Sequence, residues 1–129
     1  MKPENIVLMA YNDIVNHKKN PFPGKMFNRP DGEDVYAGVV IDYFGKDVTP
    51  ENFIAVLTGD ADAVTKTDKR TTGKVLTSTS EDNVYIYFTD HGDDNVISFP
   101  SKYLFADELI DTLKTMNMKR MYKELVFYL

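Results

Sequence analysis

Three short runs of apolar and aromatic residues, far apart in the chain, constrain the fold most strongly. They occupy residues 6–10, 84–88 and 125–129, and each has about the length of one strand. Such runs are typical of strands in a parallel sheet, and the run at 6–10 suits a strand buried on both faces. A chain of 129 residues corresponds to about one domain.

Two helices are predicted between these runs. Thr49 can cap a helix that begins at Pro50, where the missing N–H of proline costs nothing, and Gly59 can end it. A second helix is expected over residues 106–118, because its apolar residues fall on one helical face. The resulting alternation of strands and helices predicts an α/β fold with a mostly parallel sheet.

Residues 11–47 contain three of the six prolines and four of the seven glycines and are expected to be largely irregular. Short extended pieces are predicted around residues 35–36 and 39–41. An irregular segment of this length is unusual in a compact domain and is often functional. Residues 65–82 are rich in Thr, Ser and Lys and are expected to form an exposed loop.

Composition excludes several classes of protein. The net charge of −5 and the pI of about 4.9 argue against nucleic-acid binding, which needs clustered Lys and Arg. Cysteine is absent, which excludes disulfides, cysteine-based zinc sites and a cysteine nucleophile among these residues. No apolar run approaches the roughly 20 residues of a membrane-spanning helix. The run at 6–10 is also too short for the core of a signal peptide.

The sequence Thr89-Asp90-His91-Gly92 directly follows the predicted strand at 84–88. Ligand sites of open α/β sheets lie at the carboxyl ends of strands, where a histidine can transfer protons. The N–H of a following glycine can point at a developing oxyanion. The same residues could equally form a plain polar turn. Their spacing, with Asp93 and Asp94 nearby, does not favour a metal site, and no phosphate-binding loop or Gly-x-Ser-x-Gly motif is present.

Several longer stretches together resemble the legumain family, the asparaginyl endopeptidases, which are cysteine proteases with a caspase-like fold. They cover nearly the whole chain in order, and the set is specific although each stretch alone is weak. The stretches are Asn28-Arg-Pro-Asp-Gly-Glu-Asp-Val-Tyr36, Asp47-Val-Thr-Pro-Glu-Asn-Phe53, Ala55-Val-Leu-Thr-Gly-Asp60 and Tyr87-Phe-Thr-Asp-His-Gly92.

The resemblance implies roles for three residues. His91 matches the catalytic histidine of the family, Gly92 matches the residue whose N–H helps form the oxyanion hole, and Asp90 matches the acidic residue before the histidine. The family hydrolyses peptide bonds after Asn, and less readily after Asp, through a cysteine thiolate. The resemblance further implies peptide or protein substrates, no cofactor and no metal. It also implies a parent enzyme that reaches lysosomes or vacuoles through the secretory pathway.

One departure from the family decides how the chain is interpreted. The family nucleophile follows the strand that begins at Val126, in a Glu-Ala-Cys-Glu-Ser-like stretch that these residues do not contain. We therefore expect residues 1–129 to be an internal part of a peptidase domain, without the family's first strand and later strands, and inactive alone. The strand at 125–129 would then be an exposed apolar edge that favours association.

Three alternatives remain open at this stage. The chain could be a truncated, non-catalytic product that acts as a binding module. It could be a relative of the transamidases that attach lipid anchors to proteins, which share the His-Gly turn. It could also be an unrelated small α/β binding domain.

Overall fold

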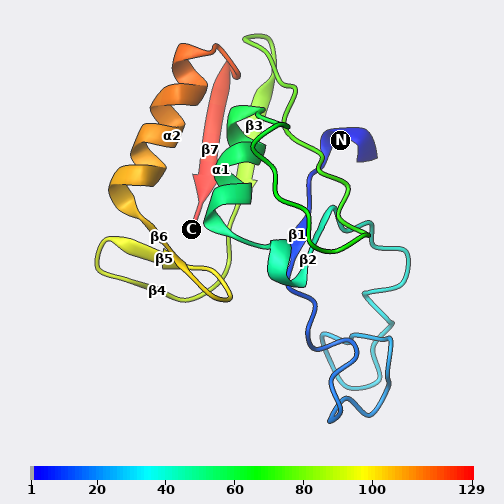
Figure 1. Ribbon diagram of the computed structural model, residues 1–129. Coiled ribbons are helices and arrows are strands. Elements are labelled where there is room, and N and C mark those ends of the chain that lie inside the picture. The colour runs from blue at the N-terminus through cyan, green and yellow to red at the C-terminus, as the bar shows by residue number, and fades with distance from the viewer. Residues whose placement is uncertain (1) are drawn as a thin grey trace.

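A computed structural model describes residues 2–129 as a mixed α/β protein, in agreement with the predicted class. Two helices lie on the same side of a parallel strand pair, and a small antiparallel sheet lies near the end to which that pair points (Figure 1). The elements are η1 (Pro3–Asn5), β1 (Met9–Ala10), β2 (Tyr43–Phe44), η2 (Gly45–Asp47), α1 (Pro50–Thr58), β3 (Asn83–Tyr87), β4 (Gly92–Asp93), β5 (Val96–Ser98), β6 (Tyr103–Phe105), α2 (Ala106–Met118) and β7 (Glu124–Tyr128).

The strands of the described residues form three separate sheets. β3 pairs with β7 in parallel over five residues, and β1 pairs with β2 in parallel over two. β4, β5 and β6 form an antiparallel sheet in that order. The parallel pairing of β3 with β7 matches the prediction from the runs at 84–88 and 125–129, with each strand displaced by one residue.

The expectation for residues 6–10 is wrong in two respects. Only Met9 and Ala10 pair with another strand, and residues 7–10 are half-buried instead of buried on both faces. Ile6 is 46% exposed. A hollow lined by Leu8 and Ala10 leaves part of this strand without packed side chains, and β1 has a hydrogen-bonded neighbour on one edge only among the described residues.

Local signals place both helices where the sequence predicts them. The Thr49 hydroxyl accepts a hydrogen bond from the Asn52 N–H (3.2 Å), and Gly59 ends α1 in the left-handed conformation, at φ 68°. Lys119 of the segment after α2 donates to the Thr58 carbonyl oxygen at the end of α1 (3.0 Å). Within residues 2–129, no helix is both long enough and apolar enough to cross a membrane.

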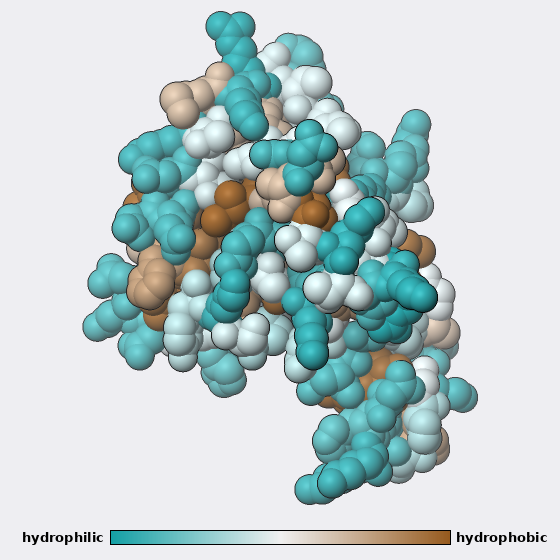
Figure 2. Space-filling view, in the orientation of Figure 1, coloured by the Kyte–Doolittle hydropathy of each residue, from teal (hydrophilic) through white to brown (hydrophobic). Residues whose placement is uncertain are grey.

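The core lies between the helices and one face of the strands. Charged and polar side chains cover most of the helix side, with apolar surface visible between them (Figure 2). Within the part of the chain that the structure describes, no helix lies against the opposite face of β3 and β7. The most buried large core side chains are Tyr43, Leu104 and Met116. The exposed large hydrophobic side chains of the bare face are Tyr85, Tyr87, Val126 and Tyr128.

Residues 11–41 form a lobe that projects away from the helices (Figure 1). The lobe has no strand or helix, so the extended pieces predicted around 35–36 and 39–41 do not become paired strands. Side chains organise it instead. The Asn20 amide donates to the carbonyl oxygens of Val15 (3.0 Å) and Lys25 (3.0 Å), and Asp34 accepts from the Met26 and Tyr36 N–H groups.

Candidate functional site

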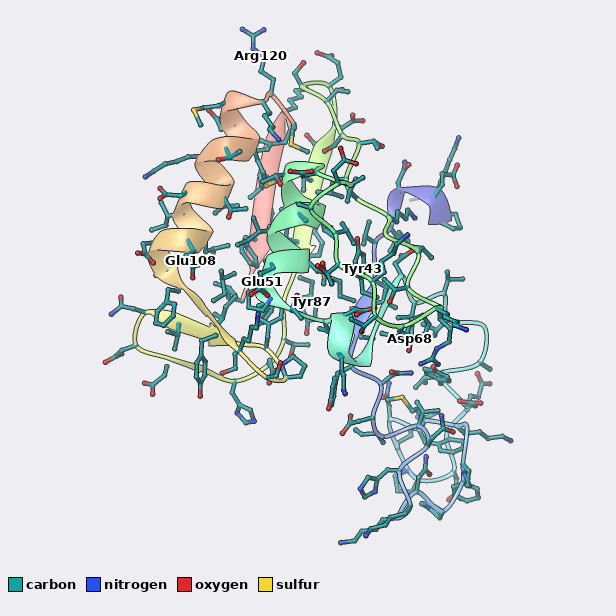
Figure 3. All side chains as sticks on the ribbon, viewed as in Figure 1. Tyr43, Glu51, Asp68, Tyr87, Glu108 and Arg120 are labelled. Carbon is teal, nitrogen blue, oxygen red and sulfur yellow. The ribbon has the colours of Figure 1, made fainter. Side chains whose placement is uncertain are left out.

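The predicted site residues follow β3 at its carboxyl end, after Tyr87 (labelled in Figure 3). The Phe88 N–H donates to the Tyr128 carbonyl oxygen (2.9 Å), which extends the pairing with β7 by one residue. The chain then leaves the parallel strands through Thr89 and Asp90 and enters β4 at Gly92. The site therefore lies where the parallel strands end and the antiparallel sheet begins.

Hydrogen bonding in the antiparallel sheet fixes the backbone around His91. The Ser98 N–H donates to the His91 carbonyl oxygen (2.8 Å), and Gly92 lies opposite Ile97. In an antiparallel ladder this bond makes Gly92 and Ile97 a non-hydrogen-bonded pair. The Gly92 N–H consequently points away from β5. Since β4 is the edge strand of its sheet, this N–H faces outward.

The side chains of Asp90 and His91 are exposed. One Asp90 carboxylate oxygen accepts a hydrogen bond from the His91 N–H (2.7 Å), so Asp90 stabilises the turn through the backbone. Among residues 2–129 the His91 ring has no hydrogen-bond partner. The three predicted residues are consecutive in the chain, and the structure places them where β4 begins, with the imidazole open to solvent.

Packing anchors this sheet to the core through Phe99. Its ring lies 5.6 Å from the Phe53 ring of α1 and 5.3 Å from the Phe88 ring, and Phe99 is buried. Lys102 forms an ion pair with Glu51 in the first turn of α1. This contact with Lys102 lowers the pKa of the Glu51 carboxyl. The turn that carries His91 is therefore connected to the helix layer by an aromatic cluster and by a surface ion pair.

Other features of the surface do not coincide with the site. The larger hollow, about 520 Å³, lies along α2 and is lined by residues such as Ile110 and Met118. A smaller hollow of about 290 Å³ lies between β1 and the 11–41 lobe. Neither is lined by His91. In the described part of the chain, no three acidic or histidine side chains are grouped so that they could hold a metal ion.

Sequence reasoning missed Ser98 and the role of the turn before it. Residues 93–95 are polar and residues 96–99 are mostly apolar. This pattern favours a turn and an extended piece, but it does not indicate that the extended piece returns against His91. One signal was available. Residues 93–95 are a short polar stretch between two possible strands, and such a stretch is typical of a hairpin.

Comparison with known proteins identifies the family. Residues 1–129 match the model of the Peptidase C13 family over their whole length. The chain belongs to the Peptidase C13 family. It is 50% identical to legumain of Mus musculus and 49% identical to legumain of Homo sapiens, each over 126 residues. It is 46% identical over 129 residues to the vacuolar-processing enzyme beta-isozyme of Arabidopsis thaliana.

The length of these C13 relatives limits what membership implies. The matched region covers 98% of this chain and 28% of each legumain, and for the Arabidopsis protein 99% of this chain and 26% of the relative. The chain therefore spans little more than a quarter of the length of these relatives. C13 is a cysteine peptidase family, and these 129 residues contain no cysteine.

Proposed function

We propose that this chain supplies the histidine half of a cysteine-peptidase active site. In this role His91 transfers the protons, Gly92 donates its N–H to the oxyanion, and Asp90 holds the turn. The observation that carries the proposal is the direction of the Gly92 N–H, which points out of the β4–β5 ladder beside His91. A free backbone donor and an exposed imidazole are two of the groups that acyl transfer uses, beside the nucleophile.

The nucleophile of this reaction is not among residues 1–129, which lack cysteine. We place its thiolate at the carboxyl end of β7. The parallel pairing of Tyr87 with Tyr128, and the bond from the Phe88 N–H to Tyr128, bring that end beside the segment that leads to His91. A thiol carried there would emerge at the same edge of the sheet as the imidazole.

The proposed reaction is hydrolysis of a peptide bond after Asn, and less readily after Asp. The thiolate attacks the carbonyl carbon, and the Gly92 N–H stabilises the oxyanion that forms. His91 gives a proton to the leaving amine, and a thioester remains. His91 then takes a proton from water as the water attacks the thioester, which releases the acid product and the thiol. We also propose a lysosomal or vacuolar location for the whole enzyme. The name of one relative, a vacuolar-processing enzyme, supports the vacuolar alternative.

A chimera tests the role of His91. The segment of mouse legumain that matches this chain is replaced by residues of this chain, and hydrolysis of an Asn-containing peptide is measured. We expect His91→Ala to lower kcat by about 10²–10⁴-fold, the usual contribution of a general acid–base group. The matched control is His17→Ala, which changes the other histidine of these 129 residues and should leave kcat unchanged.

Gly92 offers a second pair of variants in the same chimera. Gly92→Pro removes the N–H and should lower kcat by about 10²–10³-fold, as loss of an oxyanion donor does. Gly92→Ala keeps the N–H, and its added Cβ would lie 3.4 Å from the Val96 carbonyl oxygen, an ordinary contact. Full activity of the chimera with His91→Ala would overturn the proposal.

A further inference from the structure

The turn between β4 and β5 determines which way the Gly92 N–H points. Asp93 pairs with Val96, so only Asp94 and Asn95 connect the two strands. Asn95 has φ 62°, in the left-handed region that few residues other than glycine adopt and that Asn tolerates best among the rest. A connection of two residues fixes the register of the strands on either side of it.

Asn95 is also held by a hydrogen bond on the side of β5 that faces away from β4. Its carbonyl oxygen accepts a hydrogen bond from the N–H of Ala106 (2.9 Å), the first residue of α2. This bond continues the β5–β6 ladder, in which Val96 lies opposite Phe105. β5 is thus fixed by β6 and by the start of α2, whereas β4 is an edge strand with one neighbour.

A change of register at this turn would therefore be taken up by β4. When one strand of an antiparallel pair slips by one residue, its side chains move to the opposite face of the sheet. Residues of that strand that were in non-hydrogen-bonded pairs then enter hydrogen-bonded pairs, and the reverse. Gly92 would then enter a hydrogen-bonded pair, and its N–H would bond to β5 instead of facing outward. The Ser98 N–H would also lose its present partner, the His91 carbonyl oxygen.

We propose that Asn95 is a positioning residue, whose left-handed turn keeps the Gly92 N–H outside the β4–β5 ladder and available to an oxyanion. The inference rests on the proposed function of Gly92. Asn95 acts through the backbone and touches no reacting atom. Its side chain matters because it permits the left-handed conformation, so glycine should replace it and a β-branched residue should not.

Two variants test the proposal in the 129-residue chain. Amide hydrogen exchange of Gly92, followed by NMR, reports whether its N–H bonds to β5. We expect fast exchange in the original chain and in Asn95→Gly, and slower exchange in Asn95→Val. Asn12→Val is the matched control, because Asn12 is also left-handed (φ 40°) but lies in the 11–41 lobe. It should leave the Gly92 amide unchanged.

The same variants in the mouse legumain chimera give the functional result. Asn95→Val should lower kcat by about 10–10²-fold with KM within about twofold, since the oxyanion donor acts in the transition state. Asn95→Gly should keep the original kcat. If Asn95→Val does not fold, Asn95→Ala provides the same comparison with less strain.

The outcomes separate this inference from the proposed function. Fast Gly92 exchange and unchanged kcat in Asn95→Val, with loss of activity in His91→Ala, would overturn the role of Asn95 and leave the proposed function intact. Unchanged activity in His91→Ala would overturn the proposed function itself. Loss of activity in Asn95→Gly equal to that in Asn95→Val would also overturn the inference, because glycine preserves the turn.

Discussion

Hydrogen bonds from Thr67 to the carboxylate of Asp47 join the loop after α1 to the segment just before α1, inside the protein. Asp47 is 1% exposed and accepts hydrogen bonds from both the N–H (2.9 Å) and the hydroxyl of Thr67, and the N–H of Asp68 adds another (3.0 Å). Burial alone would raise the pKa of Asp47. The hydrogen bonds, with the Thr67 hydroxyl first among them, outweigh burial and lower the pKa below the ordinary value of 3.8.

We expect Asp47→Asn to lower the free energy of unfolding by about 3 kcal/mol at pH 7, because hydrogen bonds to a charged group contribute about 1.5–3 kcal/mol each. The carboxyl has a lower pKa folded than unfolded. Its contribution is therefore complete well above the ordinary value of 3.8 and is lost as the pH falls through the folded pKa. Denaturant unfolding at pH 7 and at about pH 3 should show the gap between the two proteins narrowing in acid.

The control for this prediction is Asp60→Asn. Asp60 is exposed, and its carboxylate accepts one hydrogen bond, from the Ala63 N–H (3.1 Å). The change should cost less than about 1 kcal/mol. Equal losses of stability for the two substitutions would contradict the role assigned to burial and to the bonds from Thr67 and Asp68.

Gly59 combines a left-handed conformation with a lack of space. An added Cβ would lie 2.9 Å from the Leu76 carbonyl oxygen and 3.1 Å from the Met121 side chain. Gly24 is also left-handed (φ 85°), but a Cβ there meets nothing within 4 Å. We expect Gly24→Ala to cost about 1 kcal/mol from conformation alone, and Gly59→Ala to cost about 1–3 kcal/mol more, since the clash adds overpacking strain. Thermal and denaturant unfolding would measure both, and equal costs would show that the contact with Leu76 yields easily.

The helices could be predicted because their signals are local. Thr49 caps α1 from a position next to its first residue, and Gly59 ends it in the left-handed conformation that glycine adopts readily. The apolar face within residues 106–118 marks α2 in the same way. Such signals depend on neighbours within about one turn, so no distant partner has to be known.

The strands at the N-terminal side could not be predicted in the same way. The partner of β1 is Tyr43–Phe44, more than thirty positions away, in a segment whose glycines and aspartates indicated irregular structure. Residues 6–10 are apolar enough for a strand buried on both faces, but burial depends on which strands lie beside them. In this structure a neighbour is present on one edge only.

The candidate site was predictable as residues but not as geometry. His91 and Gly92 were identified from their position after a strand, and the roles assigned to them stay predictions. The direction of the Gly92 N–H depends on Ser98 lying opposite His91. That pairing follows from the conformation of Asn95 and from the ladder between β5 and β6. The short polar spacing before Val96 is typical of a hairpin, but it does not give the register of the two strands.

The 129-residue chain should not hydrolyse peptides by itself. It contains no cysteine, so no thioester can form, and an imidazole with one oxyanion donor lacks the nucleophile of the reaction. A fluorogenic peptide with Asn before the scissile bond would measure this. Hydrolysis that His91→Ala abolishes would contradict the prediction, whereas hydrolysis that survives His91→Ala would indicate a contaminating protease.

The bare face of β3 and β7 predicts that the isolated chain associates. Its four large hydrophobic side chains are each 56–60% exposed, and the rings of Tyr87 and Tyr128 stack at 5.4 Å. β7 has a partner on one edge only, and no charged residue interrupts it after Glu124. Unpaired apolar edges pair with further chains, and a lysine on the edge blocks such pairing.

Val126→Lys should therefore shift the chain towards monomer, as measured by size-exclusion chromatography with light scattering over a range of concentrations. Val40→Lys is the matched control, because Val40 is 74% exposed but lies in the 11–41 lobe. It should leave association unchanged, since the charge then lies away from the free edge of β7. If the unaltered chain is a monodisperse monomer at every concentration, the prediction is wrong, because the aromatic face and the edge of β7 then stay exposed without causing association.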